Sequence, residues 1–392
     1  MITKTLRLLA VLAMVAAAIA MTGCGPKAAP STSVMDSPEY HYNQGLKLMD
    51  ADRLDDAMRE FDRAVALDPK SPLGFIGKGL TLGKKGDFKP AFENMEKAKG
   101  LEKTGIEAHI GMIRLYGMQM AKDQKKVKDL ARAAEKEFKA ADKIAPKNAR
   151  LHYYMGMCYK MELDFDKAAP MFRTVLDING DFVPEANAEW ALIQKIQRAA
   201  PGSEIGKKIA LIDKIDRADI AALFDQEMNL EKLFTKRGTK TYDTTFKPPT
   251  ESSTAMQTET VTKMAAATDI NDNWLKPSIE TVLKLRIRGL EAGPNHKFEP
   301  DKLITKSEFA LMLEDILIKV SGDEKLATKY LGATSPFPDV RNDHYAFNAI
   351  MMTTSRGFLE ADKATGEFRG NEYVSGADAL LSIREFKNQL KF

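Results

Sequence analysis

The chain has 392 residues, and its 58 lysines and arginines against 55 aspartates and glutamates give a formal net charge of +3. This length predicts two or three domains, and a charge so close to zero argues against a simple basic nucleic-acid-binding protein. Two cysteines and five histidines exclude a disulfide framework and a cysteine-rich zinc site, and we expect neither a metal nor a cofactor.

The N-terminus has the pattern of an export signal. A short basic stretch precedes an uncharged apolar run at 8–21, which has the length of a signal-peptide core and is short for a membrane span. The run ends in Met-Thr-Gly-Cys, which resembles a bacterial lipobox. This resemblance implies a signal peptide at 1–23 and acyl chains on Cys24, followed by a flexible tether at 24–37. Because Gly25 is not Asp, it also implies an outer-membrane location facing the periplasm. A plain secretory signal and an uncleaved anchor helix are the alternatives.

Between residues 38 and 182, small and aromatic residues recur with a spacing of 34. Gly45 and Gly79 are 34 residues apart, and so are Ala57 and Ala91. Each block has the apolar pattern of two short amphipathic helices joined by a turn. These residues resemble the tetratricopeptide repeat, which implies an all-α solenoid of helical hairpins. The matching units are 38–71, 72–105, 106–148 and 149–182, and the third contains about nine extra residues.

The resemblance implies a concave groove lined by the first helix of each hairpin. Projecting the family's groove positions onto this chain selects Tyr42, Met49, Ile76, Leu80, Tyr153, Met157 and Lys160. Their mostly apolar and aromatic character fits a protein partner bound as a peptide or a helix, and packing between hairpins is the alternative. We expect Cys158, within an apolar helical pattern, to be a buried and inert thiol.

A different kind of unit comes next, and residues 268–320 show it most clearly. An aromatic residue, Trp274, precedes a predicted helix at 277–288, and a glycine-rich loop then leads to a second helix. Thr305 and Glu308 have the spacing of a capping box at the start of that second helix. This pattern resembles the S-layer homology unit. Its copies are 183–235, 268–320 and 336–392, with a linker rich in Thr, Ser and Pro, predicted to be mobile, at 236–267.

In that family, three units form one mainly helical, pseudo-threefold body whose grooves bind anionic cell-wall glycan. The arginine of a Thr-Arg-Ala-Glu motif contacts the ligand. The resemblance assigns this contact to Arg217 in the first unit and Lys306 in the second, whereas the third unit has Gly376. The aromatic candidates for the same grooves are Trp190, Trp274 and Tyr345. Surface charges for the two cations, and core packing for the aromatic residues, are the alternatives.

The sequence has no phosphate-binding loop, dinucleotide glycine motif or metal-binding helix motif, so we predict no catalytic residue. We expect a non-enzymatic cell-envelope scaffold. Its lipid would anchor it to a membrane, its solenoid would bind a protein partner, and its C-terminal units would attach to a peptidoglycan-linked polymer or an envelope protein. The alternatives are an outer-membrane assembly factor for a pilus or secretion system and, less favoured, an envelope glycan enzyme.

Overall fold

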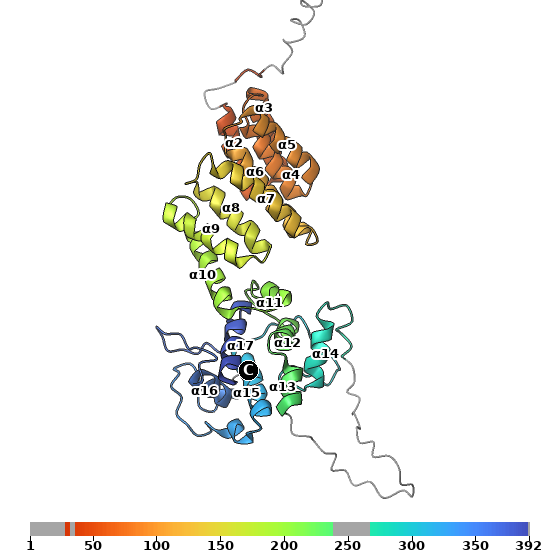
Figure 1. Cartoon of the computed structure of the whole chain (residues 1–392), viewed down its shortest axis with the longest axis vertical. Helices are drawn as coiled ribbons and strands as arrows, with labels where there is room; N and C mark the ends of the chain where they lie inside the picture. Colours follow the sequence, from red (N-terminus) through yellow and green to blue (C-terminus); the bar gives the residue numbers. More distant parts are fainter. Residues whose placement is uncertain (1–27, 32–35, 238–266, 391–392) are drawn as a thin grey trace, which may run out of the picture. The chain divides into compact units, whose positions relative to one another are not determined.

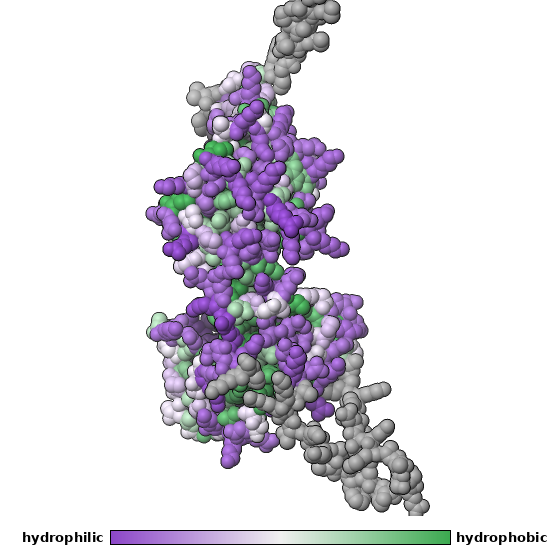
Figure 2. Space-filling model, viewed as in Figure 1, coloured by the Kyte–Doolittle hydropathy of each residue, from purple (hydrophilic) through white to green (hydrophobic). Residues whose placement is uncertain are grey.

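The computed structural model describes residues 28–31, 36–237 and 267–390. The predicted signal peptide, Cys24 and nearly all of the predicted linker lie outside these residues. The chain divides into two compact units, Met1–Trp190 and Ala191–Phe392. Both are helical (Figure 1), and on the face in Figure 2 hydrophilic side chains cover most of each unit. None of the described helices is both long and apolar enough to cross a membrane.

The first unit is a row of helical hairpins, as predicted. Its helices are α2 (Pro38–Asp50), α3 (Leu54–Leu67), α4 (Leu73–Lys85), α5 (Phe88–Leu101), α6 (Glu107–Lys122), α7 (Val127–Asp142), α8 (Ala149–Met161) and α9 (Phe165–Ile178). The two helices of each hairpin pack together, and the first helices also contact one another in the order α2, α4, α6, α8. This arrangement confirms the predicted all-α solenoid.

Small residues allow the helices of a hairpin to approach closely. A Cβ atom on Gly45 would lie 2.4 Å from Cε1 of Phe61, whose ring is completely buried. Ala57 on α3 is also completely buried. The third hairpin is the longest: α6 and α7 have 16 residues each, whereas α4 has 13 and α5 has 14. The extra residues therefore lengthen the tip of this hairpin.

The second unit begins within a helix. α10 (Val183–Ala199) contains the division after Trp190. The remaining helices are α11 (Glu204–Ile209), α12 (Arg217–Gln226), α13 (Leu230–Arg237), α14 (Lys276–Lys284), α15 (Lys306–Ser321), the 3-10 helix η1 (Glu324–Thr328), α16 (Phe347–Ser355) and α17 (Gly376–Leu390). The described part of this unit has no strand and only two isolated β-bridges.

Three backbone hydrogen bonds close a ring at the centre of the second unit. The amide of Ile215 donates to the carbonyl of Val374 at 3.0 Å, Val374 donates to Ile304 at 3.1 Å, and Ile304 donates to Ile215 at 3.1 Å. These residues precede α12, α15 and α17, the second helices of the predicted units. α12 packs on α14 and α15 packs on α16. The closed ring confirms the predicted pseudo-threefold body.

Each of the three second helices begins with a polar cap. Thr305 and Glu308 form the predicted capping box on α15, and Asp216 and Asp219 form another on α12. Burial and the neighbouring carboxylate of Asp216 raise the pKa of Asp219 to about 6. The helix predicted at 277–288 is shorter than expected. α14 ends at Lys284 because the chain then turns through a left-handed residue, Arg286, with φ of 49°.

Candidate functional site

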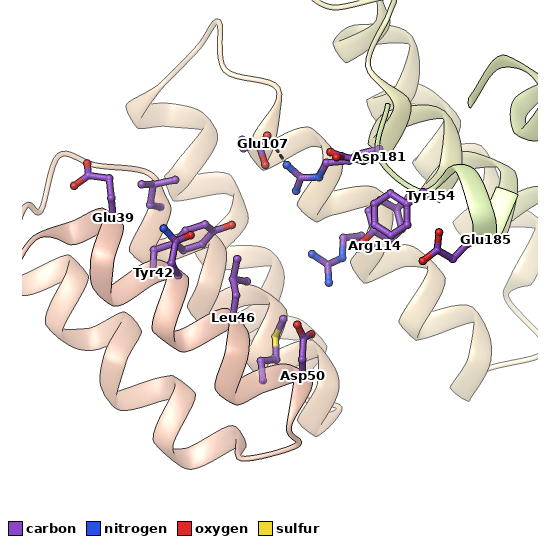
Figure 3. Close-up of a pocket in the computed structure, with 14 residues that line it drawn as sticks. Glu39, Tyr42, Leu46, Asp50, Glu107, Arg114, Tyr154, Asp181 and Glu185 are labelled. Atoms are coloured by element: carbon purple, nitrogen blue, oxygen red, sulfur yellow. Dashed lines mark hydrogen bonds and ion pairs between the residues drawn. The ribbon is translucent and has the colours of Figure 1, made fainter. Parts of the chain in front are cut away.

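A cavity of about 900 Å³ opens along the groove side of the first unit. Figure 3 shows α2 on one side of it, Arg114 and Tyr154 across from α2, and Glu185 beyond them. Glu39, Tyr42, Leu46 and Asp50 all line it from α2. Their spacing of three or four residues places them on one face of the helix.

An aromatic cluster forms the opposite side of this cavity. The ring of Phe182 stacks on Tyr153 at 4.5 Å between centroids and meets the edge of Tyr154 at 5.5 Å. Phe182 has φ of 65°, a left-handed conformation that costs a bulky residue energy. The two ring contacts offset this cost, since aromatic pairs stabilise by about 0.5–1.5 kcal/mol each. The cluster therefore fixes the chain where it leaves α9.

The charges in the cavity are mainly negative. The Glu107 carboxylate accepts a hydrogen bond from Arg150 at 3.0 Å, and the guanidinium of Arg114 lies 4.9 Å from the centroid of the Tyr154 ring. Burial and the nearby Glu107 carboxylate raise the pKa of Tyr42, so its hydroxyl remains a donor at neutral pH. The cavity thus combines aromatic and aliphatic surface with a rim of carboxylates.

The predicted groove residues are only partly brought together. Tyr42 and Met49 line the cavity, although Met49 is almost completely buried. Ile76 and Leu80 are only 2% and 1% exposed and belong to the hydrophobic core of the solenoid. They are therefore not available to a partner, because α4 packs against both α2 and α6.

The other three predicted residues lie around the Tyr153 end of the groove. Tyr153 contributes its face to Phe182 and Met157 is partly buried. The ammonium of Lys160 is held by Glu189 at 2.5 Å. None of the three lines the cavity. Of the three, Tyr153 contacts the cavity lining through Phe182, and Lys160 has an internal partner.

Sequence reasoning missed Leu46, Arg114 and Tyr154. Leu46, Leu80 and Arg114 are successively 34 residues apart, so the period itself placed Arg114 at a groove position of the third repeat. Tyr154 neighbours a predicted residue, Tyr153, and only the rotation of α8 decides which of the two rings enters the cavity. The lining residues between 181 and 185 have no repeat signal, because they follow the last hairpin.

In the second unit, the two predicted glycan-contacting cations have internal roles. Arg217 is only 9% exposed and donates to the carbonyls of Phe298 at 2.7 Å, Glu291 at 2.9 Å and Gly289. Lys306 donates to the carbonyls of Glu360 at 2.7 Å and Phe368 at 2.9 Å.

These two cations are related by the pseudo-threefold arrangement. Each lies over the phenylalanine ring of the next unit's loop, Arg217 at 4.7 Å from the Phe298 centroid and Lys306 at 4.6 Å from that of Phe368. Burial lowers the pKa of both cations. They hold the loop of the neighbouring unit, and their contact with glycan stays a prediction.

The third equivalent position has no room for a side chain. A Cβ atom on Gly376 would lie 1.7 Å from the carbonyl oxygen of Ile209. The Gly376 amide donates instead to the carbonyl of Ile212 at 2.8 Å. The C-terminal end of α11 thus occupies the space that a cationic side chain fills in the other two units.

Two of the predicted aromatic residues are well exposed. Trp274 is 63% exposed and Tyr345 is 67% exposed. They occupy equivalent positions, since the side chains of Asn273 and His344 each accept a hydrogen bond from the amide two residues later. Trp190 is partly buried and is the last residue of the compact unit that contains the solenoid. A smaller cavity of about 290 Å³ is lined by His344, the neighbour of Tyr345 in sequence, by Ser307 and by the loop of the third copy.

Cys158 is fully enclosed by the solenoid. Its side chain is 1% exposed, and burial raises the pKa of its thiol to about 12. The thiolate, which is the reactive form, is therefore absent at neutral pH. In the part of the chain that the structure describes, no three His, Cys, Asp or Glu side chains gather as a metal site.

Comparison with known proteins identifies modules in both units. Residues 38–71 match the tetratricopeptide repeat, and residues 336–380 match the S-layer homology domain. No curated protein matches the chain. It is similar to the crystal structure of a thermophilic TPR protein of Thermus thermophilus, with 20% identity and a TM-score of 0.37, over 51% of this chain and 97% of that chain. It is also similar to pilF of Pseudomonas aeruginosa, with 15% identity and a TM-score of 0.33, over 50% and 92% of the two chains.

The two matches give the coarse organisation of the molecule. Tetratricopeptide repeats are protein-binding modules, and S-layer homology domains are modules of cell-surface attachment. Neither is a catalytic module. The chain therefore contains a tetratricopeptide repeat within its helical solenoid and an S-layer homology domain within its three-unit body.

Proposed function

We propose that this protein is a non-enzymatic scaffold of the cell envelope, whose solenoid groove binds a protein partner while its three-unit body attaches to cell-wall polymer. The observation that carries the proposal is the presence of both modules in one chain. An N-terminal lipid on Cys24 and a location at the periplasmic face of the outer membrane complete the proposal. Both rest on the sequence pattern around Cys24 alone.

The geometry of the groove supports a protein partner. Its cavity of about 900 Å³ is larger than most of the range of about 300–1,000 Å³ that small-molecule pockets span. It runs beside α2 and has partly exposed apolar surface at Leu46 and Tyr154. Helices and extended segments commonly bind to such grooves through a few apolar side chains.

Removing the apolar surface of the groove should abolish partner capture. The double variant Leu46→Gln/Tyr154→Gln removes two side chains from the cavity lining, and central apolar contacts are worth about 2 kcal/mol or more each in protein interfaces. We expect captured partner to fall at least about tenfold in cross-linking and affinity capture from envelope extracts, with the captured proteins compared by mass spectrometry.

The matched control is Leu101→Gln/Ile144→Gln. These two apolar residues are 38% and 44% exposed and lie outside the cavity. The control should capture the same proteins as the unmodified chain. If the groove variant also captures an unchanged set of proteins, the groove of the solenoid does not bind the partner.

For the body, the exposed aromatic residues are better candidates for sugar contacts than the two cations. Arg217 and Lys306 already donate to loop carbonyls. Trp274 and Tyr345 expose about two thirds of their surface at equivalent positions of adjacent units. Aromatic faces carry a large apolar surface at little entropic cost, which suits stacking against a sugar ring.

We therefore expect the purified protein to sediment with isolated cell-wall sacculi that retain their attached polymer. The variant Trp274→Ala/Tyr345→Ala should sediment at least about tenfold less, because each lost aromatic contact costs about 1 kcal/mol or more. Leu331→Ala, at a leucine of the three-unit body that is 66% exposed, should sediment normally. Sedimentation that is absent from the unmodified protein at low salt would contradict wall attachment.

A further inference from the structure

We infer that the segment bound in the solenoid groove is cationic: a peptide or helix of the partner with apolar side chains on one face and lysines or arginines along its edges. This inference rests on the proposed partner-binding role of the groove and specifies the chemistry of the partner. It follows from the charges that line the cavity, from their lack of internal partners, and from their position around apolar surface.

Four carboxylates at the rim have no internal counter-charge. Glu39 and Asp50 lie at the two ends of α2, and Asp181 and Glu185 lie where the chain passes from α9 into α10. All four are exposed. None of them makes an ion pair or side-chain hydrogen bond with another described residue, whereas most acidic residues of the outer solenoid helices are paired with a nearby lysine or arginine.

The two pairs of carboxylates lie on either side of the apolar surface. Glu39 and Asp50 flank Tyr42 and Leu46 along α2, and Figure 3 shows Glu185 on the far side of Tyr154. A segment bound between the two pairs of carboxylates would therefore place its apolar face on Tyr42, Leu46 and Tyr154 and its edges against the carboxylates. Carboxylates that lie close together without counter-charges make the local electrostatic potential more negative, and this potential attracts a cationic partner.

The cationic groups in the cavity are already partly committed. Arg150 donates to Glu107 at 3.0 Å, which leaves both groups near neutral as a pair. Arg114 lies over the face of Tyr154, an arrangement that stabilises a guanidinium. Its N–H groups face the cavity in Figure 3 and can donate to the main-chain carbonyls of a bound segment. The lining thus offers five carboxylates to two guanidinium groups.

Two synthetic peptides test the inference directly. They are fluorescent amphipathic helices of about 16 residues with identical leucines, one carrying lysine and the other glutamate at every polar position. We expect the lysine peptide to bind the purified full chain at least about tenfold more tightly than the glutamate peptide at low salt. The difference should narrow as ionic strength rises to about 0.5 M, because exposed charges are then screened.

Charge reversal locates the attraction. Asp181→Lys/Glu185→Lys should weaken binding of the lysine peptide about tenfold, since it removes two exposed ion pairs and adds repulsion. Glu96→Lys/Asp129→Lys changes the net charge of the solenoid by the same amount on its outer helices α5 and α7, and should alter binding less than about twofold.

The other outcomes distinguish a failure of the cationic inference from a failure of the partner-binding groove. Equal binding of the two peptides, or equal effects of the two charge reversals, would overturn the cationic partner. If neither peptide binds while the groove variant Leu46→Gln/Tyr154→Gln still loses its captured partner, the cationic inference fails and the partner-binding groove stands. If the groove variant also captures normally, the proposed function of the groove fails as well.

Discussion

Replacing Gly376 with alanine should disrupt the three-unit body and leave the solenoid folded. The added Cβ would lie 1.7 Å from the carbonyl oxygen of Ile209 and 2.5 Å from its carbonyl carbon. Both are backbone atoms, so no side-chain rotation can relieve the overlap, and α11 or α17 must move. Val374, two residues before Gly376, also donates and accepts in the central ring.

A movement of α17 would therefore break the ring that joins the three units. Inserting a methyl group into a packed core typically costs about 1–3 kcal/mol and sometimes more. With a backbone obstacle and a shared hydrogen-bond ring, we expect a loss of about 3 kcal/mol or more in the free energy of unfolding of the body. The measurement is chemical denaturation followed by tryptophan fluorescence and by circular dichroism.

Gly202→Ala is the matched control in the same unit. The nearest atom to its new Cβ would be the Glu227 carboxylate oxygen at 3.7 Å, an ordinary contact distance. Its denaturation midpoint should lie close to that of the unmodified protein. A midpoint for Gly376→Ala equal to that of Gly202→Ala would show that the C-terminal end of α11 moves aside readily. The family's arginine could then be restored at position 376, which the present geometry forbids.

The solenoid was the more predictable half of the molecule. A spacing of 34 residues between Gly45 and Gly79, and between Ala57 and Ala91, reports a local requirement for close helix packing. Local requirements of this kind are visible in the sequence. The same period, extended by one more step, also locates Arg114 in the groove.

The roles of individual side chains were less predictable, because they depend on which atoms meet across the fold. Ile76 and Leu80 have the groove spacing but are buried, since α4 has neighbours on both sides. The aromatic cluster at Phe182 lies after α9, the last helix of the repeats, and no later repeat shows a matching residue. Neither result follows from composition or spacing, because each depends on helix rotation and on contacts between distant segments.

The same limit applies to the body. A capping box is a contact between residues three apart, and Thr305 with Glu308 forms as expected. By contrast, the carbonyl partners of Arg217 lie more than 70 residues away along the chain. A family resemblance indicates where such a cation lies in the sequence. Only the three-dimensional arrangement shows whether its N–H groups donate to backbone carbonyls or are available to a ligand.

Replacing Arg217 with methionine should destabilise the body even in the absence of any ligand. The guanidinium donates to three carbonyls of the loop between α14 and α15. Hydrogen bonds from a charged donor contribute about 1.5–3 kcal/mol, and carbonyls left buried without a donor add a further penalty. Methionine retains the apolar stem, so the change isolates the polar contribution. We expect the free energy of unfolding to fall by about 3 kcal/mol.

Arg217→Lys is the informative companion, because Lys306 provides its precedent within the same body. An ammonium there reaches two carbonyls, those of Glu360 and Phe368. We therefore expect the lysine variant to lose only about 1 kcal/mol. Chemical denaturation gives both values, and hydrogen exchange of the loop amides should rise most in the methionine variant. If Arg217→Met unfolds like the unmodified protein but no longer sediments with sacculi, its guanidinium serves the polymer rather than the loop, and the internal role assigned to it is wrong.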